Sequence, residues 1–160
     1  MIEETPVFTR PSPPKLITAI SNTLISRLLR SPLHRLVSKS CVLLSFQGRK
    51  SGNSYTFPVG YFQQKEDEIE VIPLQNWWRN LRGNVPVTVW LKGRRYGAVA
   101  EVYQGDEATV EELQRLVQGA SALLRICQVE RDAQGQPKAE SVRRAARSLV
   151  LIRLRLLSLL

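Results

Sequence analysis

The sequence predicts a mainly β fold with flanking helices, in which six antiparallel strands form a small closed or split β-barrel. Six apolar or alternating runs have the length of strands, and short polar or glycine-containing turns separate most of them. Helical periodicity occurs before the first run and after the fifth. The expected strands are residues 41–46, 55–62, 69–72, 85–91, 96–102 and 148–156.

The composition is that of a globular protein with a strong excess of positive charge. Of the 160 residues, 43% are hydrophobic and 23% are charged, so the chain can bury a core. We expect an extended, proline-interrupted lead-in over residues 1–14 and one domain over residues 15–160. The net charge of +9 favours an anionic partner, namely a phosphorylated cofactor, a nucleic acid or an acidic membrane surface.

Several features favour a cytoplasmic protein. Cys41 and Cys127 are expected to be reduced, and the N-terminus lacks the basic start and apolar core of a signal peptide. His34 is the only histidine and there is no Cys-x-x-Cys pattern, so we expect no metal site. Amphipathic helices expected at residues 15–30 and 32–38 leave a peripheral contact with an anionic membrane open.

A basic turn bracketed by Gly48 and Gly52 joins the first two expected strands. The glycines permit positive φ and leave backbone N–H groups uncovered, while Arg49, Lys50 and the Ser51 hydroxyl add charge-assisted donors. These groups suit a phosphate, and a solvated basic hairpin tip is the alternative. A Walker phosphate loop is excluded, because it needs a glycine directly before the lysine and a helix after it.

In the strand that follows this turn, bulky side chains alternate with small ones. The bulky face carries Tyr55, Phe57, Val59 and Tyr61, and the small face carries Ser54, Thr56, Pro58 and Gly60. Because Pro58 has no N–H and Gly60 has no side chain to pack, this strand is expected to bulge or to lie at a sheet edge. A face of small residues also leaves room for a ligand.

The segment 76–83 has an unusual density of indole and guanidinium groups. Trp77 and Trp78 are adjacent, so they cannot share one face of a helix or strand. We expect one tryptophan in the core and the other at the mouth of the barrel. The alternative is a ring platform with Arg79 and Asn80 aimed at an anion.

Helical patterns return in the C-terminal third of the chain. Thr109 and Glu112 have the spacing of a capping box for a long amphipathic helix that ends near residue 127, and a short basic helix is expected at residues 141–147. Arg153 and Arg155 alternate with apolar residues near the end. A strand would place both arginines on one face, which favours a last strand returning to the sheet.

Three motifs carry a resemblance to a known family. They are Gly48-Arg49-Lys50-Ser51-Gly52, Tyr55-Thr56-Phe57-Pro58-Val59-Gly60-Tyr61 and Trp77-Trp78-Arg79-Asn80-Leu81-Arg82, preceded by residues 30–36. In order and spacing, from about Ser31 to the end, the chain resembles the deazaflavin-dependent nitroreductase family. That family belongs to the FMN-binding-like split β-barrels. The resemblance therefore implies this fold and binding of the deazaflavin coenzyme F-420, with FMN as the alternative cofactor.

The resemblance also implies an oxidoreductase that transfers a hydride from the reduced coenzyme to a quinone, an enone or a nitro compound. Arg49, Lys50 and Ser51 would hold the cofactor phosphate and acidic tail. The residues implied to line or complete the ring pocket are Tyr55, Thr56, Phe57, Pro58, Val59, Trp77, Trp78, Arg79 and Asn80. Tyr61, implied as the catalytic residue, another pocket hydroxyl or water would supply the proton.

Other interpretations remain open at this point. The best-known members of the family shape their substrate side with tyrosines after the long helix, and residues 123–138 contain none, which bears on nitro and quinone reduction more than on cofactor binding. A barrel binding single-stranded nucleic acid would use the positive charge with Trp77, Trp78 and Trp90 as stacking platforms. Split barrels often form homodimers, so a homodimer is also left open.

Overall fold

The computed structural model describes residues 27, 30 and 41–160. Arg27 and Arg30 have helical backbone; the other residues of the two expected N-terminal helices, together with the expected lead-in over residues 1–14, lie outside the described residues. The remaining elements follow in chain order. They are β1 (Cys41–Gln47), β2 (Ser54–Gly60), β3 (Phe62–Lys65), β4 (Glu68–Val71), the 3-10 helix η2 (Asn76–Leu81), β5 (Val85–Leu91), β6 (Arg94–Gln104), α2 (Glu107–Gly119), α3 (Ser121–Ile126), α4 (Ala139–Ser148) and β7 (Val150–Leu159).

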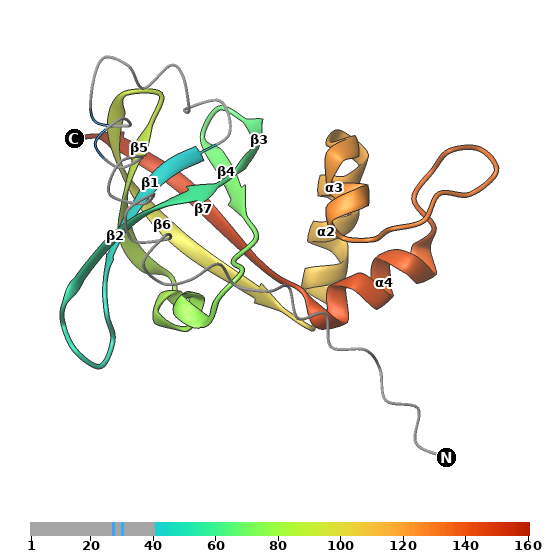
Figure 1. The fold of residues 1–160 in the computed structure, drawn as a ribbon, viewed down its shortest axis with the longest axis horizontal. Helices are drawn as coiled ribbons and strands as arrows, with labels where there is room; N and C mark the ends of the chain where they lie inside the picture. The colour runs from blue at the N-terminus through green and yellow to red at the C-terminus, as the bar shows by residue number, and fades with distance from the viewer. Residues whose placement is uncertain (1–26, 28–29, 31–40) are drawn as a thin grey trace.

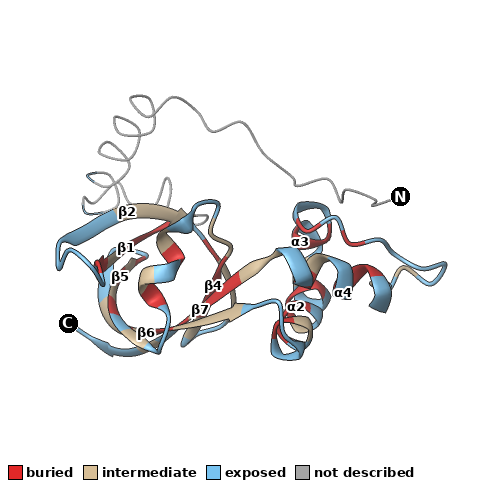
Figure 2. Ribbon diagram, turned by 90° about the horizontal axis from the view of Figure 1, so that it is seen from below, coloured by how far each residue is buried: buried red, intermediate tan, exposed pale blue. Residues whose placement is uncertain are grey.

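The strands form one antiparallel sheet in the order β2-β1-β5-β6-β7-β4-β3. β2 and β3 lie at opposite ends of this order, although Tyr61 alone separates them in the sequence. The sheet must therefore curl until its two edges approach, and Figure 1 and Figure 2 show it curled into a half-open barrel. The predicted fold class, a mainly β split barrel with flanking helices, is confirmed.

The described sheet has seven strands where the sequence predicts six, because the expected strand at residues 55–62 is divided. Tyr61 interrupts it, so that β2 pairs with β1 and β3 pairs with β4. β2 lies at the edge of the sheet, as Pro58 and Gly60 predict. Tyr61 therefore marks the place where the chain passes from one edge of the sheet to the other.

Alternate residues of the strands fill the barrel interior, as the two-residue period of a strand requires. The buried members of this core are Val42, Leu44, Phe46, Tyr61, Ile69, Val71, Trp78, Leu81, Val87, Val89, Leu91, Ala98, Ala100, Ile152 and Leu154. Trp78 and Leu81 come from η2, whose preceding residue makes no side-chain capping bond. Apolar burial therefore holds η2 against the barrel.

The helices α2, α3 and α4 lie together at one end of the molecule, opposite the loop between β1 and β2 (Figure 1, Figure 2). They enclose a second apolar cluster with one residue of β7. Its buried members are Leu113, Leu116, Val117, Leu123, Leu124, Cys127, Val129, Val142, Ala146 and Leu151. Leu151 neighbours Ile152 of the barrel core, so β7 contributes to both clusters from its two faces.

The expected long helix after the fifth strand is two helices in the structure. α2 ends at Gly119, and Ala120 has an extended backbone with φ −136° and ψ 94° before α3 begins. Glycine is a poor helix former, which accounts for a break at this point. The short helix α4 confirms the one expected at residues 141–147.

The expected capping box at the start of this helix is wrong. Asp106 is the N-cap, and its Oδ1 accepts hydrogen bonds from the backbone N of Thr109 at 2.8 Å and from the Thr109 hydroxyl at 2.5 Å. The N-cap therefore lies three residues earlier than expected. Glu112 is not available to a cap, because it is buried and contacts Arg115 and Arg153.

This contact belongs to a buried charge network that connects α2 to the outer face of the sheet. Glu112 lies between Arg115 of α2 and Arg153 of β7, and Arg115 also donates to Oε1 of Glu70 on β4 at 2.7 Å. Burial alone would raise the pKa of the Glu112 carboxyl, but the hydrogen bonds from Arg115 and Arg153 outweigh it and hold that pKa below its usual range. Glu112 is therefore ionised at neutral pH.

Two strands extend the network across the sheet. Glu101 of β6 forms an ion pair with Arg155 at 2.6 Å and accepts a hydrogen bond from the Tyr103 hydroxyl at 3.1 Å, and Arg153 lies 3.6 Å from the same carboxylate. Arg153 and Arg155 thus lie on one face of β7, as their spacing predicts. The part of the sheet that faces Glu112 and Arg115 of α2 is therefore polar and charge-paired.

Glu70 occupies the least exposed position in this network, with 1% of its surface exposed. Its Oε2 atom has no hydrogen-bond partner among the described residues. Burial raises the pKa of the Glu70 carboxyl above the ordinary value of 4.5, against the lowering effect of Arg115. The folded protein therefore binds this proton more tightly than the unfolded chain does.

For Glu70→Gln we expect a stability difference that depends on pH. Because the pKa of Glu70 is raised in the folded protein, wild type loses stability relative to the variant as pH rises from 4.5 through the folded-state pKa. Over this range wild type must bury an ionised carboxylate, whereas the glutamine of the variant stays neutral. Unfolding in urea at several pH values between 4 and 8 measures this difference, in which carboxyls common to both proteins cancel. A difference that grows in favour of wild type with pH would contradict the assignment.

Candidate functional site

The basic turn between β1 and β2 has a fixed backbone. The N–H of Gly48 donates to the carbonyl of Asn53 at 2.8 Å, and the N–H of Gly52 donates back to the carbonyl of Gly48 at 2.9 Å. Gly52 has φ +67°, in the left-handed region that favours glycine. Together these bonds shape the five residues 48–52 into a closed loop at the end of the hairpin.

Gly48 serves the turn by close approach and not by positive φ, which corrects the expectation for this residue. A Cβ atom built on Gly48 would lie 2.7 Å from Cε2 of Tyr55 and 2.8 Å from Oγ of Ser51. Those distances are shorter than contacts that real Cβ atoms make. The glycine therefore allows Tyr55 and Ser51 to close over the turn.

The cationic side chains of the turn are exposed and available. Among the described residues, Arg49 and Lys50 have no carboxylate within 4.0 Å. Beside them, the Ser51 hydroxyl accepts from the backbone N of Asn53 at 3.2 Å and lies 3.4 Å from the Tyr55 hydroxyl. The turn thus offers two unneutralised cations and two hydroxyls in one place, which is a donor set suited to a phosphate or carboxylate.

Asn80 connects η2 to this turn. Its Oδ1 accepts from the backbone N of Arg49 at 3.1 Å, and its Nδ2 donates to the carbonyl of Trp77 at 2.9 Å. Both ends of the amide are therefore engaged with the backbone. Asn80 acts as a positioning residue that brings η2 against the turn across 31 residues of sequence.

An aromatic cluster lies beside the turn where η2 meets the hairpin. Trp77 stacks on Phe46 at a centroid distance of 5.9 Å and meets Phe57 edge to face at 5.1 Å. Tyr55 packs on Phe46 at 5.8 Å and remains 43% exposed. The exposed ring of Tyr55 therefore lies next to the basic turn and packs on the buried Phe46 ring, which in turn contacts the half-buried Phe57 and Trp77.

The two adjacent tryptophans divide as expected into one core residue and one outer residue. Trp78 is 5% exposed, and the guanidinium groups of Arg82 and Arg79 lie 4.7 and 5.7 Å from its ring centroid. Trp77 is half-buried within the aromatic cluster. Arg79 is exposed beside Trp78, and Asn80 contacts the turn as described above.

The structure brings together Arg49, Lys50, Ser51, Tyr55, Phe57, Trp77 and Asn80 of the predicted site residues. Thr56 and Pro58 lie on the opposite face of β2, where the Thr56 hydroxyl bonds Ser45 Oγ at 2.9 Å. Val59 packs on the barrel core farther along the strand. The roles of these residues in a cofactor site stay predictions.

Tyr61, the predicted catalytic residue, lies at the other end of β2 from the turn. Tyr61 follows Ser54 by seven positions of extended chain, or about 23 Å at the rise of a strand. Tyr61 is buried in the barrel core, and burial, followed by the charge of nearby Cys41, raises the pKa of its hydroxyl. The hydroxyl is therefore protonated at neutral pH, and its catalytic role stays a prediction.

Phe46 is a member of the aromatic cluster that sequence reasoning missed. It contacts Tyr55, Phe57 and Trp77, and so joins the hairpin to η2. The sequence does contain a signal for this role of Phe46. If the turn closes with Gln47 opposite Ser54, the antiparallel register places Phe46 directly opposite Tyr55.

Two pockets lie elsewhere on the described surface. One of about 630 Å³ lies at α3 and the segment that follows it, and one of about 470 Å³ is lined by residues of β3 and of the β5–β6 turn. The three tryptophans that a nucleic-acid-binding interpretation needs as stacking platforms are buried or half-buried, and Trp90 has guanidinium groups of Arg30 and Arg95 each 5.3 Å from its ring. Among the described residues, no helix is long and apolar enough to cross a membrane.

No protein-family model and no curated protein matches the sequence. Several solved structures, among them the following three, have a backbone trace similar to that of this chain. A candidate pyridoxamine 5′-phosphate oxidase from Lactobacillus delbrueckii has 12% identity and a TM-score of 0.48, over 79% of this chain and 88% of that chain. An F-420-H2-dependent reductase has 17% identity and a TM-score of 0.47, over 73% and 95%. A candidate 5-nitroimidazole antibiotic resistance protein from Bacteroides thetaiotaomicron has 12% identity and a TM-score of 0.49, over 79% and 78%. The fold assignment stands on the strand order described above.

Proposed function

We propose that the chain is an oxidoreductase that uses the deazaflavin coenzyme F-420 and reduces a small electrophile such as a quinone, an enone or a nitro compound. FMN is the alternative cofactor for the same site, the basic turn at residues 48–52 with the adjoining aromatic cluster, which we call the cofactor seat. The observation that carries the proposal is the hydrogen bond from the Arg49 backbone N to Asn80, because it joins the basic turn to the aromatic cluster. A phosphorylated cofactor with an aromatic ring system needs both kinds of surface close together.

The residues present fit the acidic part of such a cofactor. Arg49, Lys50 and the Ser51 hydroxyl would hold its phosphate and acidic tail, since the two cations lack a carboxylate partner among the described residues. The close approach that Gly48 permits keeps Ser51 and Tyr55 directed at the same place. The exposed face of Tyr55 would contact the ring system.

When bound, the reduced coenzyme would supply a hydride, which is a two-electron reductant. The chain's own residues would bind and orient the coenzyme and supply the proton that completes the reduction. Asn80 fixes the turn relative to η2, and Trp77 and Phe57 back the exposed Tyr55 ring through Phe46. Tyr61 remains the predicted proton donor, with the Tyr55 hydroxyl, another pocket hydroxyl or water as alternatives.

Replacing Lys50 with Ala is expected to weaken binding of oxidised F-420 about tenfold while leaving the protein folded, because one charge-assisted contact with the phosphate or acidic tail is lost. Titration followed by the coenzyme's fluorescence measures the affinity, with FMN titrated in parallel. The matched control is Arg147→Ala, which removes the same charge from the exposed face of α4.

Three outcomes are distinguishable in this titration. Preference for F-420 that falls in the Lys50 variant and not in the Arg147 variant supports the proposal. Preference for FMN keeps the seat and changes the cofactor. Equal affinities in the two variants, or no binding of either cofactor, would show that the turn is a solvated hairpin tip.

A further inference from the structure

The pocket at the helical end of the molecule has the features of a second ligand site. Its volume of about 630 Å³ lies within the range of small-molecule sites. It is lined by Ser121, Ala122, Leu124, Arg125, Gln128, Val129, Glu130 and Arg131. The helices that carry it lie at the opposite end of the molecule from the β1–β2 loop (Figure 1, Figure 2), so it is separate from the proposed cofactor seat.

The floor of this pocket is apolar and its backbone is held in place. Leu124 and Val129 are 6% and 7% exposed, and the N–H of Val129 donates to the carbonyl of Leu124 at 2.7 Å, which folds the segment after α3 back onto the helix. The N–H of Glu130 donates to the Ser141 hydroxyl on α4 at 2.9 Å. The pocket is therefore preformed by contacts within the chain.

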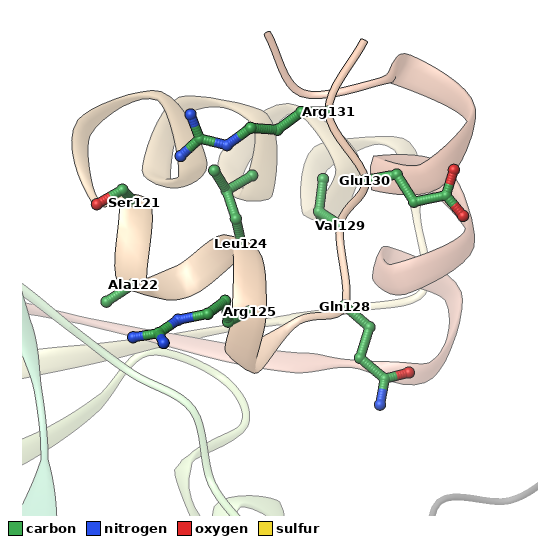
Figure 3. A pocket seen from close by; sticks show the side chains of 8 residues that line it. All are labelled: Ser121, Ala122, Leu124, Arg125, Gln128, Val129, Glu130 and Arg131. Atoms are coloured by element: carbon green, nitrogen blue, oxygen red, sulfur yellow. The ribbon is translucent and has the colours of Figure 1, made fainter. Parts of the chain in front are cut away.

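Two arginines flank this floor. Figure 3 shows the side chains of Arg125 and Arg131 extending in the same direction on either side of Leu124. Within the part of the chain that the structure describes, neither guanidinium has a carboxylate within 4.0 Å, and Arg131 makes a long hydrogen bond of 3.4 Å to the carbonyl of Gly135. Their charge is therefore available to an anion.

The acidic residue in the lining does not neutralise these arginines. The carboxylate of Glu130 points away from them in Figure 3 and accepts from Nζ of Lys138 at 3.1 Å. The hydrogen bond and the charge of Lys138 hold the pKa of the Glu130 carboxyl below its usual range. Glu130 is thus ionised and paired outside the pocket at neutral pH, and the pocket keeps its positive charge.

We propose that this pocket binds an amphipathic anion, a molecule that carries a carboxylate or phosphate group on an apolar body. Arg125 and Arg131 contact the anionic group, and Leu124 and Val129 contact the apolar body. The hydroxyl of Ser121 lies in the same lining, on the side toward which the two arginines extend in Figure 3, and supplies a further hydrogen-bonding group. The apolar floor gives the site its preference for a ligand over a free inorganic anion.

Calorimetric titration of the full chain with octanoate and octyl phosphate, both below their micelle-forming concentrations, tests this proposal. Two matched probes each lack one of these features: octanol lacks the charge, and inorganic phosphate lacks the apolar body. We expect saturable binding of at least one amphipathic anion, at least tenfold tighter than either matched probe, and the tighter of the two anions identifies the preferred head group. No binding of either anion, or equal binding of octanol or inorganic phosphate, overturns the proposal.

Variants locate the site and separate it from the cofactor seat. Arg125→Ala and Arg131→Ala are each expected to weaken binding about tenfold, and Arg125→Lys is expected to restore part of the affinity. Arg147→Ala, on α4, and Lys50→Ala, in the hairpin turn, should leave it unchanged. Equal losses of affinity in the Arg147 and Arg125 variants would show that binding depends only on the net charge of the protein, and would overturn the assignment.

Discussion

Replacing Glu112 with Ala is expected to lower the free energy of unfolding by about 3 kcal/mol, the low end of the cost of breaking a buried ion pair. Glu112 is 8% exposed and lies between Arg115 and Arg153, so its removal leaves two guanidinium groups without their shared partner. The value lies at the low end because the side chain of Arg115 is 33% exposed and water solvates part of it. Urea unfolding at pH 7 measures the loss.

The matched control for this experiment is Glu107→Ala on the same helix. Its ion pair with Arg143 is 3.6 Å long and joins side chains that are 70% and 63% exposed, so its loss should cost less than about 1 kcal/mol. If the Glu112 variant does not fold, Glu112→Gln removes the charge and keeps an acceptor for one arginine. Equal stabilities of the Glu107 and Glu112 variants would show that the network does not hold α2 on the sheet.

The fold could be predicted because its strands carry local signals. Alternating apolar residues fix which face of each strand is buried, and short turns fix which neighbours pair antiparallel. Pro58 and Gly60 mark an edge strand, and the spacing of Arg153 and Arg155 marks a strand where a helix would separate them. The division at Tyr61 has no such signal, since it depends on which edges of the curled sheet meet.

The start of α2 shows how two local signals can compete. Asp106 and Thr109 are both good N-cap residues, and each has a plausible partner three residues later. The structure selects Asp106, because Glu112, the partner of Thr109 in the expected box, is drawn into contact with Arg153 on β7. A contact between residues 41 apart in the sequence therefore decides a local question.

The candidate site likewise has parts that the sequence predicts and parts that depend on tertiary contacts. The charges of the turn and the aromatic residues of β2 and η2 are visible in the sequence, whereas the hydrogen bond from Arg49 to Asn80 spans 31 residues and has no local pattern. Glycine at position 48 permits a positive φ, but the structure uses it for a close approach to Tyr55 and Ser51. Both features require the tertiary arrangement of the hairpin and η2.

Replacing Gly48 with Ala is expected to reduce affinity for F-420 or FMN at least tenfold while the barrel stays folded. The new Cβ would lie 2.7 Å from Cε2 of Tyr55 and 2.8 Å from Oγ of Ser51, so one of these side chains or the turn must move. Tyr55 packs on Phe46, and the Gly48 backbone bonds both Asn53 and Gly52, so neither movement is free. Overpacking of this kind costs about 1–3 kcal/mol of stability.

The effect of this substitution on binding can be separated from the loss of a glycine as such. Gly52 lies in the same turn with φ +67° and has no atom within 4 Å of a built Cβ. Gly52→Asn should keep the cofactor affinity within about twofold of wild type, because asparagine adopts the left-handed conformation with little strain. Fluorescence titration of both variants with F-420 and FMN, and urea unfolding of each, give the comparison. Wild-type affinity in the Gly48 variant would show that the positions of Tyr55 and Ser51 do not matter, and the cofactor seat would then have to lie outside the turn.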